Sequence, residues 1–386
     1  MTAKSDVARQ ITARAEQGRE AEEAPPRLFL PSGSTLLNLM CTDTIHGAFP
    51  MGKLVNIIGD SQSGKTLVAF NALAECARLP AFDGHRCIYD DAEEANEFDM
   101  VRMFGRKMVS RLEPPNTYKE MEQDEDTERV IHEKGDPRHS ATIQDFQGNF
   151  YRAREEGVPF LYIEDSLDAL SSEEEVEKTE KNIKLRDAGK ETKGSYGMDK
   201  AKALTQMLRM FHRDLKETNS LLIIISQTRE NIDPMSMETK TRAGGKALKF
   251  YACLELWTAV IGRVKSRDRV IGVDVRVRCK KNKITGKERE AVFRIYYDYG
   301  IDDIGSCIDF LVAEGFWKAK GAVSTKKNAK PTGEITATDL GVTLSRSALI
   351  QWIEDNNKEG ALRRATGKAW NEIEESLRLG RKSRYE

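Results

Sequence analysis

Long apolar runs are missing from this sequence of 386 residues. The longest of them, such as Leu-Leu-Ile-Ile-Ile at 221–225, have the length of a buried strand and are far too short to cross a bilayer. Residues 1–20 are charged throughout and contain no apolar stretch of the kind that a secretion signal requires. The sequence therefore predicts a cytoplasmic protein with no membrane span.

Cysteine is scarce, and charge of one sign is lacking. The six cysteines are scattered without a Cys-x-x-Cys pair or a histidine cluster, so neither a zinc site nor a disulfide framework is implied. The net charge is only −1, which argues against attraction of the whole protein to nucleic acid. From Gly262 to Arg289, however, eleven basic residues stand against three acidic ones. Such a run is either a solvated face or a patch that binds a polyanion.

The sequence does contain alternating strand and helix patterns. Strand-like runs, the first four almost continuously apolar, lie at 53–58, 87–90, 160–164, 221–226, 252–258 and 292–298. A helix is expected at 198–217, where apolar residues recur at helical spacing. The alternation predicts right-handed crossovers and an α/β fold with a doubly wound, largely parallel sheet. Residues 113–141 are polar and predict a surface insertion, and residues 171–197 predict a flexible loop.

Both ends of the chain are predicted to lie outside this core. Region 1–30 contains a helical pattern at 5–17 whose apolar stripe is too narrow to hold it in place, so a partner surface and a role in oligomerisation are expected. The core is then expected to cover 31–300. A small α+β C-terminal domain is expected at 301–386, with a Lys/Thr/Gly-rich connector at 319–335.

A phosphate-binding pattern, G-x-x-x-x-G-K-[ST], lies between the first strand and an amphipathic helix at 67–77. Its glycines let backbone N–H groups curl around phosphates, and the dipole of the following helix points at their charge. Lys65 is expected to reach the β- and γ-phosphates of ATP, and the Thr66 hydroxyl to coordinate Mg²⁺. The expected nucleotide contacts of the loop are Gly59, Asp60, Ser61, Gln62, Ser63, Gly64, Lys65 and Thr66.

Acidic and amide side chains at other strand ends complete the predicted site. Because successive strand residues point to opposite faces, only one of Glu164 and Asp165 can face the metal, and we assign Asp165. A salt bridge at the strand end is the alternative for either acid. Candidates for orienting the attacking water lie in Asp90-Asp91-Ala-Glu93-Glu94. Gln227 is placed to touch a γ-phosphate, although by itself it is an ordinary polar strand end.

These motifs resemble the bacterial RecA recombinases and their phage relatives over about residues 31–318. FPMGKLVNIIGDSQSGKT, IYDDAEEANEFDMVRMFG, IEDSLDAL and SQTRENI are each similar to a family segment. The resemblance implies that Glu93 is the catalytic glutamate, that Asp165 is the metal-site acid and that Gln227 is the γ-phosphate sensor. With Lys65, Glu93 and Gln227 form the expected catalytic set.

Two further matches imply contacts with other subunits and with DNA. Residues 244–251 (GGKALKFY) are similar to the segment that closes the family's second DNA-binding loop and touches a neighbouring subunit. Lys281 and Lys283 resemble a lysine pair that crosses to another subunit's ATP, although alone they are unremarkable in a basic stretch. The implied DNA-facing loops are 186–200 and 229–248, with contacts expected from Lys193, Tyr196, Lys202, Arg229, Arg242, Gly244, Gly245 and Lys246.

The chain also departs from the family pattern. Met100, with Phe98 nearby, stands where the family places an aromatic residue against adenine, so Met100 is the expected nucleotide contact there. The first loop is longer, the insertion at 113–141 is extra, and the C-terminal GRKSRYE is basic rather than acidic. These differences indicate a divergent member from a phage or prophage.

The resemblance implies a DNA-dependent ATPase and DNA recombinase that uses ATP and Mg²⁺. Expected partners are single-stranded and double-stranded DNA, further copies of the chain in a helical filament or a ring, and single-strand-binding and loader proteins. The alternatives are a RecA-fold ATPase of helicase-like or KaiC-like regulatory type and a P-loop kinase without a nucleic-acid role. Ring helicases use arginine fingers where this chain has Lys281 and Lys283.

Overall fold

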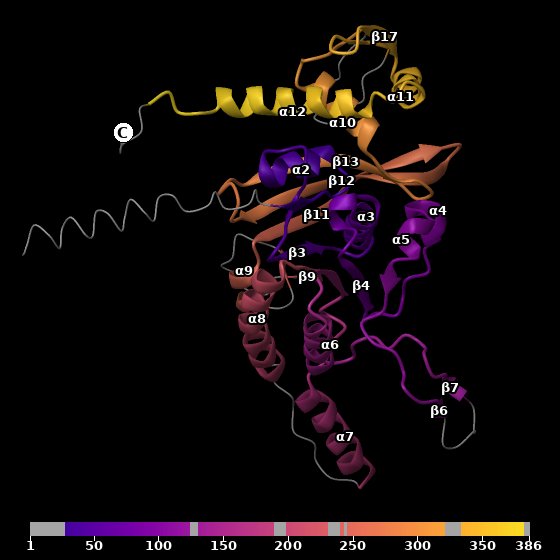
Figure 1. Ribbon diagram of the computed structural model, residues 1–386, viewed down its shortest axis with the longest axis vertical. Coiled ribbons are helices and arrows are strands. Elements are labelled where there is room, and N and C mark those ends of the chain that lie inside the picture. The colour runs from indigo at the N-terminus through magenta and orange to yellow at the C-terminus, as the bar shows by residue number, and fades with distance from the viewer. Residues whose placement is uncertain are drawn as a thin grey trace, which may run out of the picture.

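A computed structural model describes residues 28–123, 130–188, 198–230, 240–242, 245–320 and 333–381. Most of the strands form one sheet with helices on both faces (Figure 1). Its parallel part contains, in spatial order, β5 (Leu112–Glu113), β4 (Arg86–Asp91), β8 (Phe160–Asp165), β9 (Leu221–Glu230), β3 (Lys53–Gly59) and β11 (Leu254–Ser266). The sheet continues antiparallel through β12 (Arg269–Asn282), β13 (Arg289–Tyr296) and β14 (Gly300–Asp302), and β10 (Lys240–Arg242) pairs with β9. The predicted doubly wound, largely parallel sheet is confirmed.

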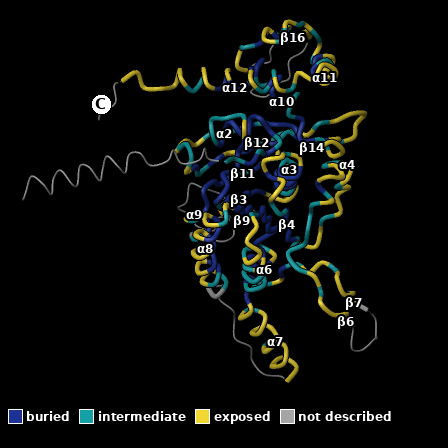
Figure 2. The backbone as a smooth tube through the Cα atoms, viewed as in Figure 1, coloured by how far each residue is buried: buried dark blue, intermediate teal, exposed yellow. Residues whose placement is uncertain are grey.

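The residues of the central strands are almost all buried, and the tube is dark blue there in Figure 2. Odd-numbered residues 221–225 of β9 belong to the cluster that packs under α2 (Thr35–Thr42) and α3 (Lys65–Arg78). Leu222 and Ile224 belong to the cluster with α6 (Ile143–Glu155), α8 (Met198–Thr218) and α9 (Gly245–Tyr251). Both faces are apolar because helices cover both, and the alternation assigns every strand residue to one face.

Short elements complete the core around the sheet. They are β1 (Phe29–Leu30) paired with β2 (Phe49–Pro50), the 3₁₀ turn η1 (Pro80–Phe82), α4 (Met100–Phe104) and α5 (Arg106–Val109). The α3 helix begins two residues before the predicted range 67–77 and ends one residue after it. No helix in the described ranges is both long enough and apolar enough to pass through a bilayer.

The predicted flexible loop at 171–197 is wrong for its first half, which forms α7 (Glu173–Asp187). The Ser172 hydroxyl accepts the Glu175 N–H at 3.3 Å, and the Glu175 carboxylate accepts the Ser172 N–H at 3.2 Å. This capping box starts a helix with no buried residue, which projects away from the sheet in Figure 1. The Ser-x-x-Glu spacing is the sequence signal for it.

The basic stretch from Gly262 to Arg289 contains a strand that the six predicted runs omit. The predicted strand 252–258 extends as β11 to Ser266 and turns into β12, and the two strands pair antiparallel along almost their whole length. Buried Val273, Val275 and Val277 alternate with polar residues along β12. That period of two is the signal for the strand.

The insertion at 113–141 lies on the surface, as predicted, and contains the hairpin β6 (Glu122–Gln123) and β7 (Val130–His132). Its Tyr118 and His132 rings stack 4.1 Å apart. The returning end is anchored to the core, because the Ser140 N–H and hydroxyl donate to the buried Asp90 carboxylate at 2.8 and 2.6 Å. The end of the insertion is therefore fixed to β4, the strand that precedes Glu93.

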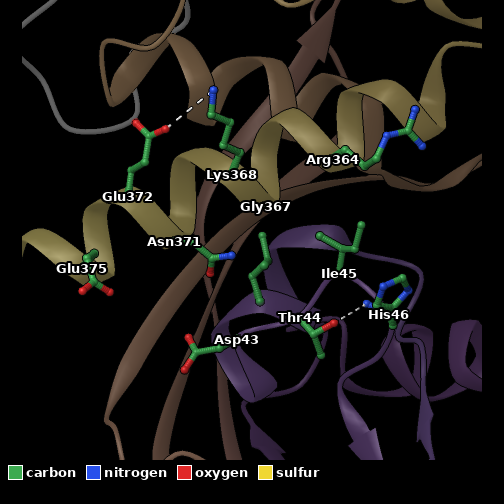
Figure 3. A pocket seen from close by; sticks show the side chains of 11 residues that line it. Asp43, Thr44, Ile45, His46, Arg364, Gly367, Lys368, Asn371, Glu372 and Glu375 are labelled. Carbon is green, nitrogen blue, oxygen red and sulfur yellow. Dashed lines mark hydrogen bonds and ion pairs between the residues drawn. The ribbon is translucent and has the colours of Figure 1, made fainter.

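The C-terminal part has a core of its own. Its elements are α10 (Asp303–Ala313), the antiparallel strands β15 (Lys318–Ala319), β16 (Glu334–Ala337) and β17 (Val342–Ser345), α11 (Arg346–Asp355) and α12 (Glu359–Ser376). The predicted α+β character is confirmed. A groove of about 640 Å³ lies between α12 and the turn at 43–46, and none of the predicted site residues lines it (Figure 3).

Candidate functional site

The phosphate-binding loop joins β3 to α3 at the carboxyl end of the parallel strands. Gly64 takes the left-handed conformation, with φ of 85°, and caps α3 without a side-chain hydrogen bond. The first N–H groups of α3 therefore have no capping side chain and are available to an anion. At Gly59 a Cβ atom would lie 2.1 Å from Oγ1 of Thr258, so no larger residue fits. This cradle suits a chain of phosphates.

Lys65 is held inside this loop. Its Nζ donates to the Asp60 carbonyl at 2.8 Å, and the residue is buried. Burial lowers the pKa of the Lys65 ammonium, while the negative charges of Asp165 and Glu93 oppose that shift. A cation that is already partly stripped of water and surrounded by acids is well suited to exchange its carbonyl partner for phosphate oxygens.

Asp165 lies beside the hydroxyl of Thr66, which donates to its Oδ2 at 2.8 Å. It shares its face of β8 with Leu161 and Ile163, which pack in the cluster under α3. Glu164 is fully buried on the opposite face, where burial and the charge of Asp90 hold its pKa well above the ordinary range. Of the two acids, only Asp165 therefore adjoins the phosphate-binding loop.

The pair formed by Thr66 and Asp165 fits a magnesium ion. Within the described ranges, no group of three or more His, Cys, Asp and Glu side chains could hold a metal ion by itself. Mg²⁺ needs no such cage, because it uses one or two protein ligands together with phosphate oxygens and water. Burial raises the pKa of the Asp165 carboxyl to about 6, against the Thr66 hydrogen bond, so the site favours a cation as partner.

Replacing Asp165 by asparagine is expected to stabilise the metal-free protein at neutral pH. Because the folded pKa of about 6 lies above the ordinary 3.8, this carboxyl favours the folded state at low pH and loses that contribution as the pH rises through 6. The asparagine removes a cost of about 3 kcal/mol at pH 7.5, and this gain should vanish near pH 4. Thermal unfolding in a chelating buffer at both pH values measures it.

The matched variant Glu164→Gln separates the two acids. Since burial disfavours the charged form of Glu164, glutamine should reproduce the shape and charge of its protonated form, and turnover and stability should stay near those of the wild type. Asp165→Asn should instead lower ATP turnover by about 10²-fold or more, as removal of a group that holds the charge-stabilising metal does. Equal losses in both variants would contradict the assignment of Asp165.

Glu93 and Gln227 meet next to Asp165, although Glu93 follows β4 and Gln227 lies in β9. The Gln227 side-chain amide donates to Oε1 of Glu93 at 3.0 Å, and the Ser166 hydroxyl donates to the same oxygen. Glu93 is exposed to solvent. The carboxylate is therefore oriented by two donors and still open to a water molecule, which is the arrangement that a group activating water requires.

The predicted adenine contact lies beside the α3 helix. Met100 is the first residue of α4, is half-buried and packs against the cluster under α3. Phe98 is exposed and meets the Phe70 ring edge-on, with ring centroids 6.4 Å apart. Both side chains border the helix that follows the phosphate loop, and their contact with the nucleotide base stays a prediction.

Lys281 and Lys283 lie near the start of the parallel strands rather than at their carboxyl ends. Lys281 pairs with Glu255, which lies beside Asn56 of β3. Both ammonium groups donate to the Phe250 carbonyl at 3.0 Å, at the C-terminal end of α9. Burial and the neighbouring Lys283 lower the pKa of Lys281 to about 8. The pair therefore points at the end of α9, away from the phosphate loop of its own chain.

The predicted DNA contacts are described only in part. Lys202 is exposed on α8, Arg229 is exposed near the end of β9, and Gly245 begins α9. Lys193, Tyr196 and Gly244 lie outside the described residues, as does the predicted helix 5–17, and the side chains of Arg242 and Lys246 are not described. The predicted loops are also too wide, since 186–187 and 198–200 are helical and β10 lies within 229–248.

Two residues of the site were not found from the sequence. The Tyr89 hydroxyl donates to the Asp165 carboxylate at 3.3 Å, and Asp168 binds the end of β9. Tyr89 has the same strand parity as Asp91, so the alternation along β4 could have placed it on this face. Asp168 lies three residues beyond Asp165, but its partner depends on where β8 ends beside β9, and no local pattern gives that.

The sheet, the loop and the acid at the end of β8 define a P-loop protein of the α/β class. The family of the RecA N-terminal domain matches residues 157–302 of the chain. Protein RecA of Colwellia psychrerythraea is 31% identical over 276 residues, which span 72% of this chain and 68% of the relative. Protein RecA of Acinetobacter baylyi is 29% identical over the same shares. The chain belongs to the RecA family.

Proposed function

We propose that this protein is an ATP-dependent DNA recombinase that forms filaments on single-stranded DNA and promotes homologous pairing and strand exchange. The observation that carries the proposal is the contact between Gln227 and Glu93. It joins the candidate water-activating group to the strand that leads directly into the β9–β10 stem, which brackets the predicted second DNA loop. Membership of the RecA family supports the same activity.

Hydrolysis is assigned to the groups around the phosphate loop. Lys65 and the first N–H groups of α3 hold the phosphates of ATP, and Thr66 with Asp165 holds Mg²⁺. When bound, Mg²⁺ neutralises charge on the phosphate oxygens. Glu93 orients a water molecule and accepts its proton as the water oxygen attacks the γ-phosphorus. The bond from the γ-phosphorus to the bridging oxygen breaks, and ADP and phosphate leave.

Two side chains from the end of β9 are proposed to report the nucleotide state to DNA. Gln227 contacts Glu93, and the Thr228 hydroxyl donates to the carboxylate of Asp60 in the phosphate loop. A γ-phosphate that attracts Gln227 and repels Asp60 changes both contacts at once. Because β9 continues into the stem of the predicted loop, such a change reaches the DNA-facing segment through the backbone.

Assembly is proposed to complete the nucleotide site. Phe250 is 68% exposed at the end of α9, next to the two lysines that point away from their own phosphate loop. An exposed aromatic side chain beside a paired positive charge suits a contact with another copy of the chain. In that contact Lys281 and Lys283 would leave the carbonyl groups of α9 and bind the triphosphate of the neighbouring protomer.

The double variant Lys281→Ala/Lys283→Ala is expected to lose about 10²-fold in DNA-stimulated ATP turnover, because two cations that stabilise phosphate charge are removed. The matched control Lys318→Ala/Lys320→Ala removes two lysines from the C-terminal part and should retain the wild-type rate. Steady-state turnover with and without single-stranded DNA measures both. A double variant with full DNA-stimulated turnover would rule out the shared site.

Phe250→Ala is expected to abolish filaments while leaving the protomer folded. The side chain is exposed in the protomer, so its truncation should change the free energy of unfolding by less than about 0.5 kcal/mol. Negative-stain electron microscopy with single-stranded DNA and a non-hydrolysable ATP analogue should show helical filaments for the wild type and none for the variant. Closed rings in the wild type would favour a helicase-like assembly instead.

A further inference from the structure

The carboxylate of Asp168 holds two groups from the end of β9. It lies in the turn after β8, where Oδ2 accepts the N–H of Gln227 at 2.7 Å and Oδ1 lies 3.1 Å from Nη2 of Arg229. The Asp168 side chain is only 12% exposed, whereas that of Arg229 is 62% exposed. One partner of this ion pair is therefore fixed in the protein, and the other can leave it for a ligand in solution.

The end of β9 needs this carboxylate. The last residue pair between β8 and β9 joins Glu164 to Ile224, so β9 runs on beyond its neighbour. An N–H group of β9 past that point needs another acceptor on that side. The Asp168 carboxylate is that acceptor for the N–H of Gln227. It thereby continues the hydrogen bonding along this side of β9 up to Gln227, whose side chain contacts Glu93.

The start of α8 also contacts the turn that contains Asp168. The Lys200 ammonium donates to the Asp168 carbonyl at 3.5 Å and to the Leu170 carbonyl. Lys200 is the third residue of α8, and Arg229 is the residue before the end of β9. The chain that leaves the first predicted DNA loop and the chain that enters the second therefore meet on one turn, directly after the metal-site strand.

We propose that Asp168 is a positioning residue that competes with DNA phosphate for Arg229 and so couples DNA binding to the placement of Gln227. The inference rests on the proposed function, because it takes Arg229 as a DNA contact. An ion pair with one exposed partner is weak, whereas a guanidinium binds phosphate through two parallel hydrogen bonds. A DNA phosphate therefore replaces the Asp168 carboxylate as the partner of the Arg229 guanidinium. The carboxylate then interacts with the N–H of Gln227 alone.

Two substitutions separate the two contacts of Asp168. Asparagine keeps an oxygen that can accept the Gln227 N–H but loses the charge that holds Arg229, and alanine loses both. We expect both variants to bind a single-stranded oligonucleotide about threefold to tenfold more tightly than the wild type at 0.1 M salt. Only Asp168→Ala should also lose about tenfold in the kcat of DNA-stimulated turnover, with little change in the KM for ATP.

The gain in DNA affinity must depend on Arg229. In an Arg229→Gln background, Asp168→Asn should give no tighter binding, and the slope of log affinity against log salt should fall by about 0.7 for the lost phosphate contact. Glu334→Gln is the charge-matched control, because it removes an exposed carboxylate that pairs with Lys320 at 3.2 Å in the C-terminal part. It should bind DNA and turn over as the wild type does.

Four outcomes decide the matter. Unchanged affinity in Asp168→Asn, or a gain that persists without Arg229, would overturn the competition. A kcat in Asp168→Asn as low as in Asp168→Ala would overturn the positioning of Gln227. Thermal unfolding shows whether the Asp168→Ala variant is folded. If that variant is unfolded, the Asp168→Asn variant still tests whether Asp168 and DNA phosphate compete for Arg229. Wild-type protein without affinity for single-stranded DNA would contradict the proposed function itself.

Discussion

Lys65→Ala is expected to lower kcat/KM for ATP hydrolysis by about 10³-fold. The ammonium is the one cation that the structure places inside the phosphate loop, within the described residues, and burial has already removed part of its water. Its loss leaves the charge that develops on the γ-phosphate without a protein cation from the same protomer. Steady-state turnover across ATP concentrations, with single-stranded DNA present, measures the effect.

Lys53→Ala is the matched control for that loss. Lys53 is the first residue of β3, whose last residue, Gly59, opens the phosphate loop, so the control removes the same charge from the far end of the strand. It should keep turnover within a small factor of the wild type. Equal losses in the two variants would mean that general destabilisation, and not phosphate binding, explains the result.

Glu93→Gln is expected to lower kcat by about 10²- to 10⁴-fold while the affinity for ATP persists. Glutamine keeps an oxygen that can accept from Gln227 and Ser166, so the local geometry should survive, but it can no longer take a proton from water. Single-turnover hydrolysis and binding of a fluorescent ATP analogue separate the two effects. Because the γ-phosphate then stays in place, filaments of this variant on single-stranded DNA should outlast those of the wild type.

The neighbouring Glu94→Gln serves as the control for this substitution. Glu94 is also exposed, and its carboxylate has no hydrogen bond to the site among those that the described residues make. Its replacement should leave kcat unchanged. If Glu94→Gln is as slow as Glu93→Gln, then the loop as a whole, and not one carboxylate, governs hydrolysis.

Much of the fold follows from periods in the sequence. Continuous apolar runs predict strands covered on both faces, and β3, β4, β8 and β9 are such strands. The same alternation along β8 separates Asp165 from Glu164, because neighbouring residues of a strand must face opposite sides. The phosphate loop follows from its spacing and its flanks alone. These features are local, and local patterns are sufficient to find them.

The features that the sequence prediction missed are of two sorts: some have a local pattern in the sequence, and others depend on distant partners. The capping box at Ser172 and the alternating valines of β12 are present in the sequence, although charge obscures both. The role of Asp168 could not be found from a local pattern, because it depends on β9 extending past the last residue that pairs with β8. The direction of Lys281 also depends on the distant α9, whose end lies against it.

The central claim is that ATP is held between two protomers, with the phosphate loop from one and the lysine pair from the other. Mixing equal amounts of Lys65→Ala protein and Lys281→Ala/Lys283→Ala protein on single-stranded DNA tests it most directly. Each variant alone should be nearly inactive. In the mixture about one quarter of the interfaces should combine an intact loop with an intact lysine pair. We predict that turnover recovers to about that share of the wild-type rate, and a mixture no more active than the sum of its two components would contradict the account.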